Sequence, residues 1–354
     1  MRIGLDATLV RAGRLTGVER YAISLVRELA ALAPRDVVVF RRPEAPGDLH
    51  QLPVEQHLAP PAGRLAIDQL WLPAAARRAR VDLLHSLAFP TPLLWRGRAL
   101  LTVHDASLWL HPEAASLGMR LYHQPLFPQA LRRAAAILTV SEASRRDLAA
   151  ATGVPAGRIL VTPNGVDGRF FQARAPATPG APPSLLAVGT LEPRKDLRVL
   201  LEALRLLRRD GRDLRLVLAG RSGWGPALSL GDLAPHVRLT GHVPDAELPA
   251  LYAGAACHVL PSRYEGFGLS LLEAMASGTP AVASDIPALR ELGGDAVRYA
   301  PPGEPAAFAA AIASALDERG TSLALAAAAR ERARRFTWRA CAEATLRAYR
   351  SLDR

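Results

Sequence analysis

The sequence predicts an α/β protein of two domains, each built on a parallel β-sheet. Short apolar segments alternate with helix-compatible segments along the whole chain, which is the pattern of repeated βαβ units. A Pro- and Ala-rich segment at 172–183 has almost no bulky apolar residue and separates two such series, as a linker does. The 354 residues, of which 49% are hydrophobic, are enough to bury two cores.

The predicted strands are short apolar runs bounded by turn residues. The first series places them at 2–6, 37–40, 83–85, 99–103 and 136–140, and the second at 184–188, 215–219, 237–239, 256–260, 280–283 and 296–299. Helices are expected to begin within 13–21 and run to about 32, and to cover 196–207 and about 338–351. We therefore expect an N-terminal domain at 1–171, the linker at 172–183, a C-terminal domain at 184–336 and a final helical segment at 337–354.

The chain is strongly basic, with 44 Lys and Arg against 33 Asp and Glu, a net charge of +11. Residues 1–170 hold 21 Arg against 14 acidic residues (+7), and the remainder holds 23 basic against 19 acidic residues (+4). The arginines are scattered, without an aromatic-interleaved patch, so we expect no nucleic-acid partner. Two interpretations stay open: contact of the N-terminal half with an anionic membrane surface, or an arginine-rich solvated surface.

Several features favour a cytoplasmic protein. No run approaches the about 20 apolar residues of a membrane span, and the first six residues enter a strand directly, without a signal-peptide pattern. The two cysteines, Cys257 and Cys341, are too few and too far apart for a metal knuckle or a disulfide framework, which favours a reducing compartment. A peripheral place on the inner membrane face is compatible with the positive charge.

A predicted strand-to-helix junction carries two glutamates eight residues apart, Glu265 and Glu273. The apolar run at 255–260 predicts a buried strand, and Gly266 and Gly268 precede a helical pattern. The free N–H groups and the helix dipole at such a junction bind anions and hydroxyls, and glycines permit a close approach to the backbone. Because carboxylates repel anions, the two glutamates indicate a ligand rich in hydroxyl groups, such as a sugar.

A second strand-to-helix loop carries Lys195. Of the 44 basic residues, 43 are arginine and Lys195 is the one lysine. The strand at 184–188 and the helix at 196–207 place Lys195 at the helix N-terminus. A compact, flexible ammonium suits a diphosphate there, and Arg194 adds a planar donor.

The stretch from Pro261 to Leu292 resembles the retaining glycosyltransferases of the GT4 family, whose signature is Glu, seven residues, Glu. Here the pair stands in the context E-G-F-G-L-S-L-L-E-A-M-A-S-G-T-P. The resemblance implies the GT-B fold: two Rossmann-like domains facing a central cleft, with a C-terminal helix crossing back to the N-terminal domain. It also implies transfer of a hexose from a nucleotide diphosphate sugar with retention at the anomeric carbon, without a metal or other cofactor.

The resemblance implies functional residues on the donor side. His104, Glu265 and Lys195 are the expected catalytic residues, and His104 follows the strand at 99–103. Glu273 is expected to hold the ribose, and Val243 to lie at the nucleobase. Many relatives carry Arg in place of Thr190, and Arg194 is the candidate replacement for that charge. The expected donor-binding residues are Gly17, Gly189, Thr190, Arg194, Lys195, Val243, Glu265, Gly266, Phe267, Gly268, Leu269 and Glu273.

On the acceptor side the resemblance implies His85, Asp105 and Arg145. Asp105 follows His104 and is expected to orient it, and Ser141 is expected to cap the helix that carries Arg145. The loop at 13–21 resembles the one that closes over donor phosphates, although relatives often have Gly where this chain has Glu19. The acceptor is expected to be a saccharide or a lipid-linked saccharide.

The alternatives to this interpretation differ in the nucleotide-sugar donor and in the class of protein. The loop at 189–195 is similar to that of polysaccharide mannosyltransferases, which favours GDP-mannose, and UDP-sugars are the alternative. A phosphorylase of the same fold needs a lysine for pyridoxal phosphate, but Lys195 lies in the diphosphate loop. The remaining alternative is a basic surface-binding protein with a degenerate cleft, against which Lys195, Glu265 and Glu273 argue.

Overall fold

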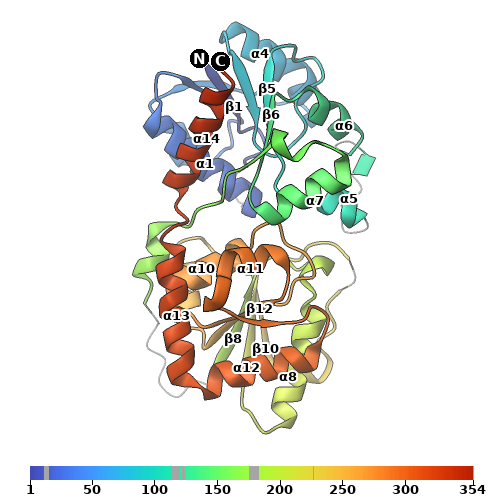
Figure 1. Cartoon of the computed structure of the whole chain (residues 1–354), viewed down its shortest axis with the longest axis vertical. Helices are drawn as coiled ribbons and strands as arrows, with labels where there is room; N and C mark the ends of the chain where they lie inside the picture. The colour runs from blue at the N-terminus through green and yellow to red at the C-terminus, as the bar shows by residue number, and fades with distance from the viewer. Residues whose placement is uncertain (12–15, 113–119, 122–123, 175–182, 226, 354) are drawn as a thin grey trace. The chain divides into compact units, whose positions relative to one another are not determined.

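Both predicted parallel sheets are present in the computed structural model, which describes residues 1–11, 16–112, 120–121, 124–174, 183–225 and 227–353 (Figure 1). The chain divides into two units: unit 1 is Met1–Gly165 with Thr337–Arg354, and unit 2 is Val166–Phe336. The sequence placed the first boundary a few residues later, at 171. Most of the predicted linker, 175–182, lies outside the described residues, and the acceptor and donor roles of the two domains stay predictions.

The sheet of unit 1 has the order β3-β2-β1-β4-β5-β6-β7, with every neighbouring pair parallel. Its strands are β1 (Ile3–Asp6), β2 (Val37–Arg41), β3 (Glu55–Leu58), β4 (Leu83–Ser86), β5 (Arg98–Thr102), β6 (Ala136–Thr139) and β7 (Ile159–Val161). Its helices are α1 (Gly17–Leu32), α2 (Gly47–His50), α3 (Arg64–Ala66), a π-helical turn (Ile67–Trp71), α4 (Leu72–Arg78), α5 (Ser107–Leu110), α6 (Gln124–Arg133), α7 (Glu142–Thr152) and α14 (Trp338–Ser351).

The sequence missed the two edge strands of this sheet, β3 and β7, while the other five strands are confirmed. Strand β3 reads Glu-Gln-His-Leu and is partly exposed along its length, so it lacks the apolar run of a buried strand. Strand β7 has three residues, too few to show a periodicity. Edge strands pair on one side, and their sequences are less constrained than those of central strands.

Helix α14 packs on α1 within unit 1, as predicted. Its residues Cys341, Ala342 and Tyr349 belong to the same buried cluster as Tyr21 and Leu25 of α1. The two helices lie side by side in Figure 1. The end of the chain therefore completes the core that the first strand and helix begin.

The sheet of unit 2 has the order β10-β9-β8-β11-β12-β13, again with all neighbours parallel. All six predicted strands are confirmed as β8 (Ser184–Val188), β9 (Arg215–Ala219), β10 (Val237–Gly241), β11 (Cys257–Leu260), β12 (Ala281–Ser284) and β13 (Arg298–Ala300). The helices are α8 (Leu197–Arg209), α9 (Leu248–Ala253), α10 (Leu269–Ser277), α11 (Pro287–Gly293), α12 (Pro305–Asp317) and α13 (Arg319–Ala333).

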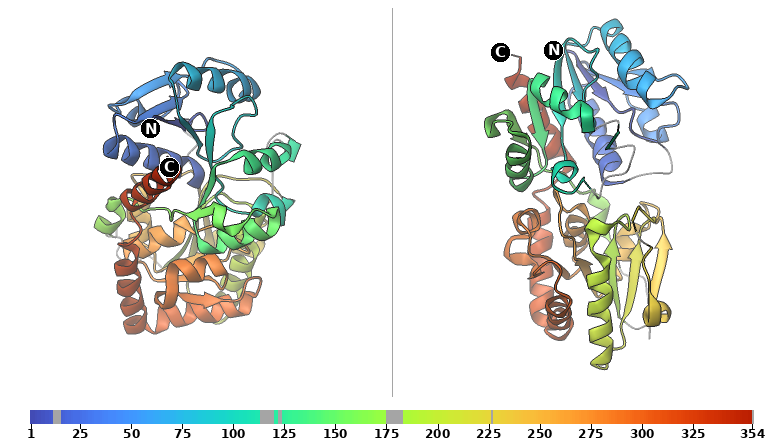
Figure 2. Two further views of the ribbon diagram at one scale, coloured as in Figure 1. Left: turned by 45° about the horizontal axis from the view of Figure 1, so that its top comes forward. Right: turned by 90° about the vertical axis from the view of Figure 1, so that its right-hand side faces the viewer.

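Helices α8 and α12 pack together against the sheet of unit 2 (Figure 2). The apolar stripe of α8, with Leu200 and Leu204, meets strand residues such as Leu216 and Val259, and Phe308 of α12 joins them. This helical stripe follows the spacing expected from the sequence. Cys257 also lies in this cluster as a core residue outside any disulfide.

Gly268 shapes the start of α10. Its φ of +99° is a left-handed conformation, and a Cβ atom there would lie 2.5 Å from Leu289 Cδ2. Glycine is therefore required for two reasons, backbone strain and close packing of α11 on the helix start.

We expect Gly268→Ala to lower the free energy of unfolding by about 2 to 3 kcal/mol, because the new methyl group adds a clash to the backbone strain. Gly303→Ala is the matched control: its φ is +81°, but a Cβ atom there meets nothing within 4 Å. Urea denaturation should give the control a smaller loss, about 1 kcal/mol. Equal losses would contradict the packing argument.

Candidate functional site

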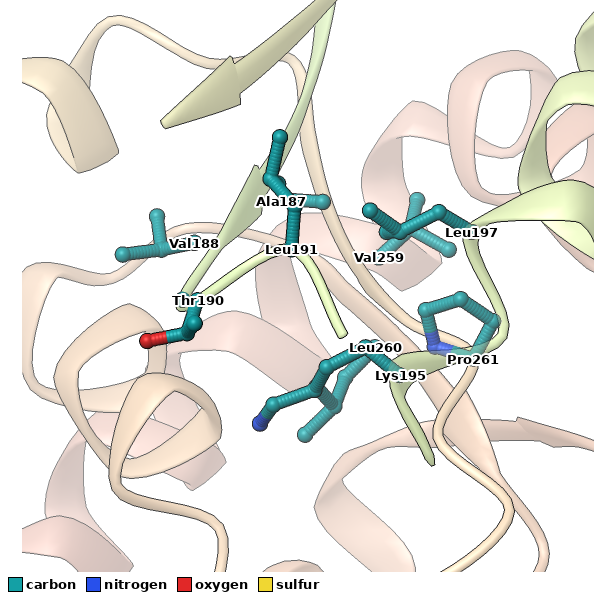
Figure 3. Close-up of a pocket in the computed structure, with 10 residues that line it drawn as sticks. Ala187, Val188, Thr190, Leu191, Lys195, Leu197, Val259, Leu260 and Pro261 are labelled. Atoms are coloured by element: carbon teal, nitrogen blue, oxygen red, sulfur yellow. The ribbon is translucent and has the colours of Figure 1, made fainter. Parts of the chain in front are cut away.

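The strand order of unit 2 reverses between the adjacent strands β8 and β11. In open parallel sheets, ligands bind at such a switch point, beyond the carboxyl ends of the strands. A small, shallow pocket that is open to solvent lies there. Its lining comes from the two strand ends and the loop after β8: Ala187, Val188, Gly189, Thr190, Leu191, Lys195, Leu197, Val259, Leu260 and Pro261. The Lys195 ammonium and the Thr190 hydroxyl lie on the same side of this pocket (Figure 3).

The carboxylate of Glu265 joins the two loops at this point. Lys195 Nζ donates to its Oε1 at 2.6 Å, Ser262 Oγ donates to the same oxygen at 2.7 Å, and Arg194 Nη1 donates to Oε2 at 2.9 Å. The Glu265 side chain is 8% exposed, so this ion pair is buried. A carboxylate with three donors is held in one orientation.

Arg194 and Asp196 add further links between the same loops. Arg194 Nη1 also donates to the Tyr264 carbonyl at 2.8 Å, and Arg263 Nε donates to the buried Asp196 carboxylate at 2.6 Å. Arg194 Nη2 donates to Glu192 at 2.6 Å. The Arg194 guanidinium thus supports Glu265 and its loop, and its expected role as a replacement for a phosphate-binding charge stays a prediction.

The environment of Glu265 keeps it ionised. Burial alone would raise its pKa, but attraction to Lys195 and Arg194 and the hydrogen bonds from Lys195 and Ser262 outweigh burial and lower the pKa to about 2. The cluster contains two positive side chains, Lys195 and Arg194, and two negative ones, Glu265 and Glu192. Its charges therefore balance.

The second glutamate of the pair, Glu273, lies inside α10 and is 5% exposed. Its Oε2 accepts a hydrogen bond of 2.8 Å from the hydroxyl of Tyr252, a fully buried residue of α9. The carbonyl of Tyr252 in turn accepts from Thr279 Oγ1 at 2.8 Å, which fixes α9 against the end of α10.

The other donor-side candidates of unit 2 divide into two groups. Gly189, Thr190 and the run from Gly266 to Leu269 follow β8 and β11, so they surround the switch point. Gly189 has φ +142°, and a Cβ atom there would lie 3.4 Å from Lys195 Cε, so the glycine faces the lysine side chain. Val243 follows β10 at the edge of the sheet and is half-buried.

In unit 1, Gly17 is the first residue of α1, and part of the loop before it, 12–15, lies outside the described residues. Glu19, the departure from the family pattern, accepts a hydrogen bond of 2.8 Å from the Thr16 backbone N–H. It therefore caps the start of α1.

His104 follows β5 and is partly buried. Its Nε2–H donates to the Leu87 carbonyl at 3.1 Å, which leaves Nδ1 as the acceptor nitrogen of the neutral ring. Burial lowers the pKa of His104. Asp105 Oδ1 accepts from the Ser107 backbone N–H at 2.8 Å and so caps α5.

The two other acceptor-side candidates, His85 and Arg145, lie in different parts of unit 1. His85 is fully buried, and its two ring nitrogens contact Tyr349 and Thr102, so it lies in the core of unit 1. Arg145 lies on α7 and pairs with Glu142 at 2.6 Å. Ser141 caps α7 as predicted, accepting from the Ser144 backbone N–H at 2.9 Å.

Sequence reasoning missed the partners of the two glutamates, Ser262 and Tyr252. Ser262 lies three residues before Glu265, a spacing that could have indicated a contact within the turn. Tyr252 gives no such signal, because it comes from a different helix. Among the described residues, no three His, Cys, Asp or Glu side chains are grouped as a metal site.

Comparisons with known proteins cover almost the whole chain. Residues 15–170 match the family described as Glycosyltransferase Family 4, and residues 182–318 match the one described as Glycosyl transferases group 1. The chain is 32% identical to the O-antigen chain mannosyltransferase B of Escherichia coli, over 96% of this chain and 97% of that protein. It is 34% identical to a phosphatidyl-myo-inositol mannosyltransferase of Mycolicibacterium smegmatis, over 66% of this chain and 60% of that protein.

Solved structures share the architecture at lower identity. The sucrose-phosphate synthase of Thermosynechococcus elongatus superposes with a TM-score of 0.77 at 22% identity, covering 99% of both chains. The Anabaena protein HepE in complex with UDP-glucose superposes with a TM-score of 0.74 at 19% identity, over 99% of this chain and 100% of that one. At such identities the likeness is one of fold.

The low pKa of Glu265 predicts a pH-dependent contribution to stability. Because the folded-state pKa of about 2 lies below the usual 4.5, ionised Glu265 stabilises the fold fully above about pH 4.5, and this contribution is lost as the pH falls toward 2. We expect Glu265→Gln to lower the free energy of unfolding at about pH 6 by on the order of 3 kcal/mol. Urea titrations at several pH values should show the difference from wild type shrinking as the pH falls.

The control for this prediction is Asp285→Asn, which removes an exposed ion pair of 2.6 Å with Arg290 in the same unit. Its effect at about pH 6 should stay below about 1 kcal/mol. A difference in the free energy of unfolding between Glu265→Gln and wild type that is small, or constant over this pH range, would show that the buried carboxylate is not stabilised as the geometry indicates.

Proposed function

The chain belongs to the GT4 family of group 1 glycosyltransferases, which are retaining hexosyltransferases, and we propose that it transfers mannose from GDP-mannose. The proposed acceptor is a hydroxyl of a saccharide or lipid-linked saccharide in the synthesis of a cell-surface polysaccharide. The similarity over nearly full length to an O-antigen chain mannosyltransferase supports this choice of sugar and pathway class.

The observation that carries the proposal is the ion pair between Lys195 and Glu265 at the switch point of the second sheet. An ammonium has three donors, and Glu265 accepts one of them, so Lys195 can bind a diphosphate without leaving its partner. The carboxylate holds the ammonium at the pocket before the ligand binds, which reduces the entropy lost on binding.

In the proposed mechanism, Lys195 stabilises the negative charge that develops on the leaving diphosphate. The N-terminus of α10 at Gly266 to Gly268 adds backbone N–H groups, and the remaining acceptor site of Glu265, on Oε2, accepts a bond from one hydroxyl of the sugar. Glu273, oriented by Tyr252, accepts bonds from the ribose hydroxyls. The proposal needs no metal ion, because Lys195 supplies positive charge at the diphosphate.

The remaining predicted residues have supporting roles in this proposal. Val243 lies at the nucleobase, Gly17 and Thr190 lie near the phosphates, and Arg194 holds Glu265 in place. His104 presents a neutral ring to the transferred sugar. Asp105 and Arg145 lie on the acceptor side, Asp105 as the cap of the helix that follows His104.

We also propose that unit 1 binds an anionic membrane surface, through a face formed by the helical segment 64–78 and the loop 91–97. Among the described residues no helix is long and apolar enough to cross a bilayer. The proposed face holds three exposed leucines, Leu65 (61%), Leu70 (62%) and Leu94 (44%).

Hydrogen bonds hold the two segments of this face together. Leu93 N–H donates to Gln69 Oε1 at 2.8 Å, and Arg77 Nη2 donates to the Leu94 carbonyl at 2.5 Å. Arg77 and Arg96, which lie near Leu94, are exposed, and the acid of these segments, Asp68, is buried and paired with Arg64. Exposed leucines bordered by arginines suit an anionic lipid interface.

Nucleotide-sugar binding tests the proposed donor. In a thermal-shift experiment with GDP-, UDP-, ADP- and dTDP-sugars, we expect GDP-mannose to raise the melting temperature of the wild type, because a ligand that binds the folded state stabilises it. Lys195→Ala should lose most of this shift. Arg212→Ala, which removes a half-buried positive charge paired with the exposed Asp317, is the control and should keep the shift.

A shift with UDP-sugars alone would replace the proposed donor and leave the transferase assignment standing. No shift with any nucleotide sugar, together with salt-sensitive DNA binding, would favour the non-catalytic surface-binding alternative.

Sedimentation with lipid vesicles tests the membrane face. We expect binding to vesicles that contain phosphatidylglycerol, weaker binding to pure phosphatidylcholine, and loss of binding at high salt, because the attraction is screened. The double variant Leu65→Ser with Leu70→Ser should bind about tenfold more weakly. Leu239→Ser in unit 2, where Leu239 is 49% exposed, is the control. An equal loss of vesicle binding in the double variant and in Leu239→Ser would refute the proposed location of the membrane face.

A further inference from the structure

Four side chains from four different elements form a buried hydrogen-bonded chain in unit 1. Tyr349 Oη of α14 lies 2.6 Å from His85 Nδ1 of β4, and His85 Nε2 lies 2.8 Å from Thr102 Oγ1 of β5. Thr102 Oγ1 lies 3.0 Å from Tyr21 Oη of α1. All four residues are at most 1% exposed.

Such a chain is costly to bury unless every member finds a partner, and a satisfied network specifies one arrangement of the core. Burial, with repulsion from His104, lowers the pKa of His85 to about 3, so its ring is neutral. A neutral imidazole has one donor nitrogen and one acceptor nitrogen. Tyr349 and Thr102 therefore take opposite roles, and loss of either partner leaves a nitrogen of His85 unsatisfied.

Two routes lead from this chain to His104. The ring of Tyr21 stands edge-on to the ring of His104, with centroids 4.6 Å apart and an interplanar angle of 86°. The carbonyl that accepts from His104 Nε2–H belongs to Leu87, two residues after His85. Thr102, bonded to both Tyr21 and His85, is itself two residues before His104. The His104 ring is therefore in contact with one member of the buried chain, Tyr21, and with a carbonyl two residues from another member, His85.

We propose that Tyr349 and His85 are positioning residues for His104. The returning C-terminal helix places the Tyr349 hydroxyl on His85, and the buried chain then sets the orientation of the His104 ring. This inference rests on the proposed function in one respect, the place of His104 beside the transferred sugar. It assigns a role in the site to the helix that ends the chain, beyond covering the core.

The test is Tyr349→Phe, which removes one hydroxyl and keeps the ring packing. We expect kcat with the accepted donor to fall about five- to tenfold, because the His104 ring is less well oriented when the buried network loses one hydrogen bond, with the donor KM changed less than about twofold. Thr102→Val, which breaks the chain at its centre, should have an effect in the same direction. The double variant should lose less than the product of the two single effects, because both variants break one network.

A readout independent of turnover follows the His104 ring directly. In protein with ¹⁵N-labelled histidine, the imidazole signals absent from His104→Gln identify His104, and we expect Tyr349→Phe to shift them. The control Tyr299→Phe removes a tyrosyl hydrogen bond of 3.1 Å to the Leu289 carbonyl in unit 2 and should leave them unchanged. Should no nucleotide sugar support turnover, the proposed function fails, while these signals still decide the positioning role. Unchanged His104 signals and unchanged kcat in Tyr349→Phe would overturn the inference.

Discussion

The buried carboxylate of Glu265 is the interaction on which the second unit depends. It joins the loop after β8 to the loop after β11 at the place where the sheet order reverses. An ionised group that is 8% exposed is stable there because three donors converge on it. The same bonds hold the ammonium of Lys195 at the pocket, so one set of contacts both stabilises the fold and prepares the site.

In unit 1 the buried polar side chains at the centre of the core are hydrogen-bonded to neutral partners. Its central polar contacts join Tyr349, His85, Thr102 and Tyr21 without a formal charge, because burial keeps His85 neutral. Burying a network of neutral hydrogen-bonding groups costs less desolvation free energy than burying an ion pair. Such a network, however, depends on the direction of each hydrogen bond. It also requires α14 to be in place, so the core of unit 1 is complete when the last helix of the chain has returned.

The sequence predicted regular elements best where apolar residues recur with a clear period. Nine central strands and the two edge strands of unit 2 were recognised, and α14 was placed with its observed bounds. Strands β3 and β7 were missed because a polar or three-residue edge strand has no such period. The caps of α1 and α7 show the same contrast: Ser141 has a recognisable capping spacing, whereas the cap from Glu19 stands at a position that the family pattern gives to glycine.

By itself the sequence determined the α/β class, all strands except β3 and β7, and the two loops that carry Lys195 and Glu265, because these follow from local periodicity and short spacings. The tertiary structure alone decided which side chains meet. Lys195 and Glu265 are 70 residues apart in the chain, and His85 and Tyr349 are 264 apart. Contacts at such separations arise from strand order and helix packing, which leave no mark on the sequence near either residue. For this reason His85 reads as a strand-end residue in the sequence and lies in a buried network in the folded protein.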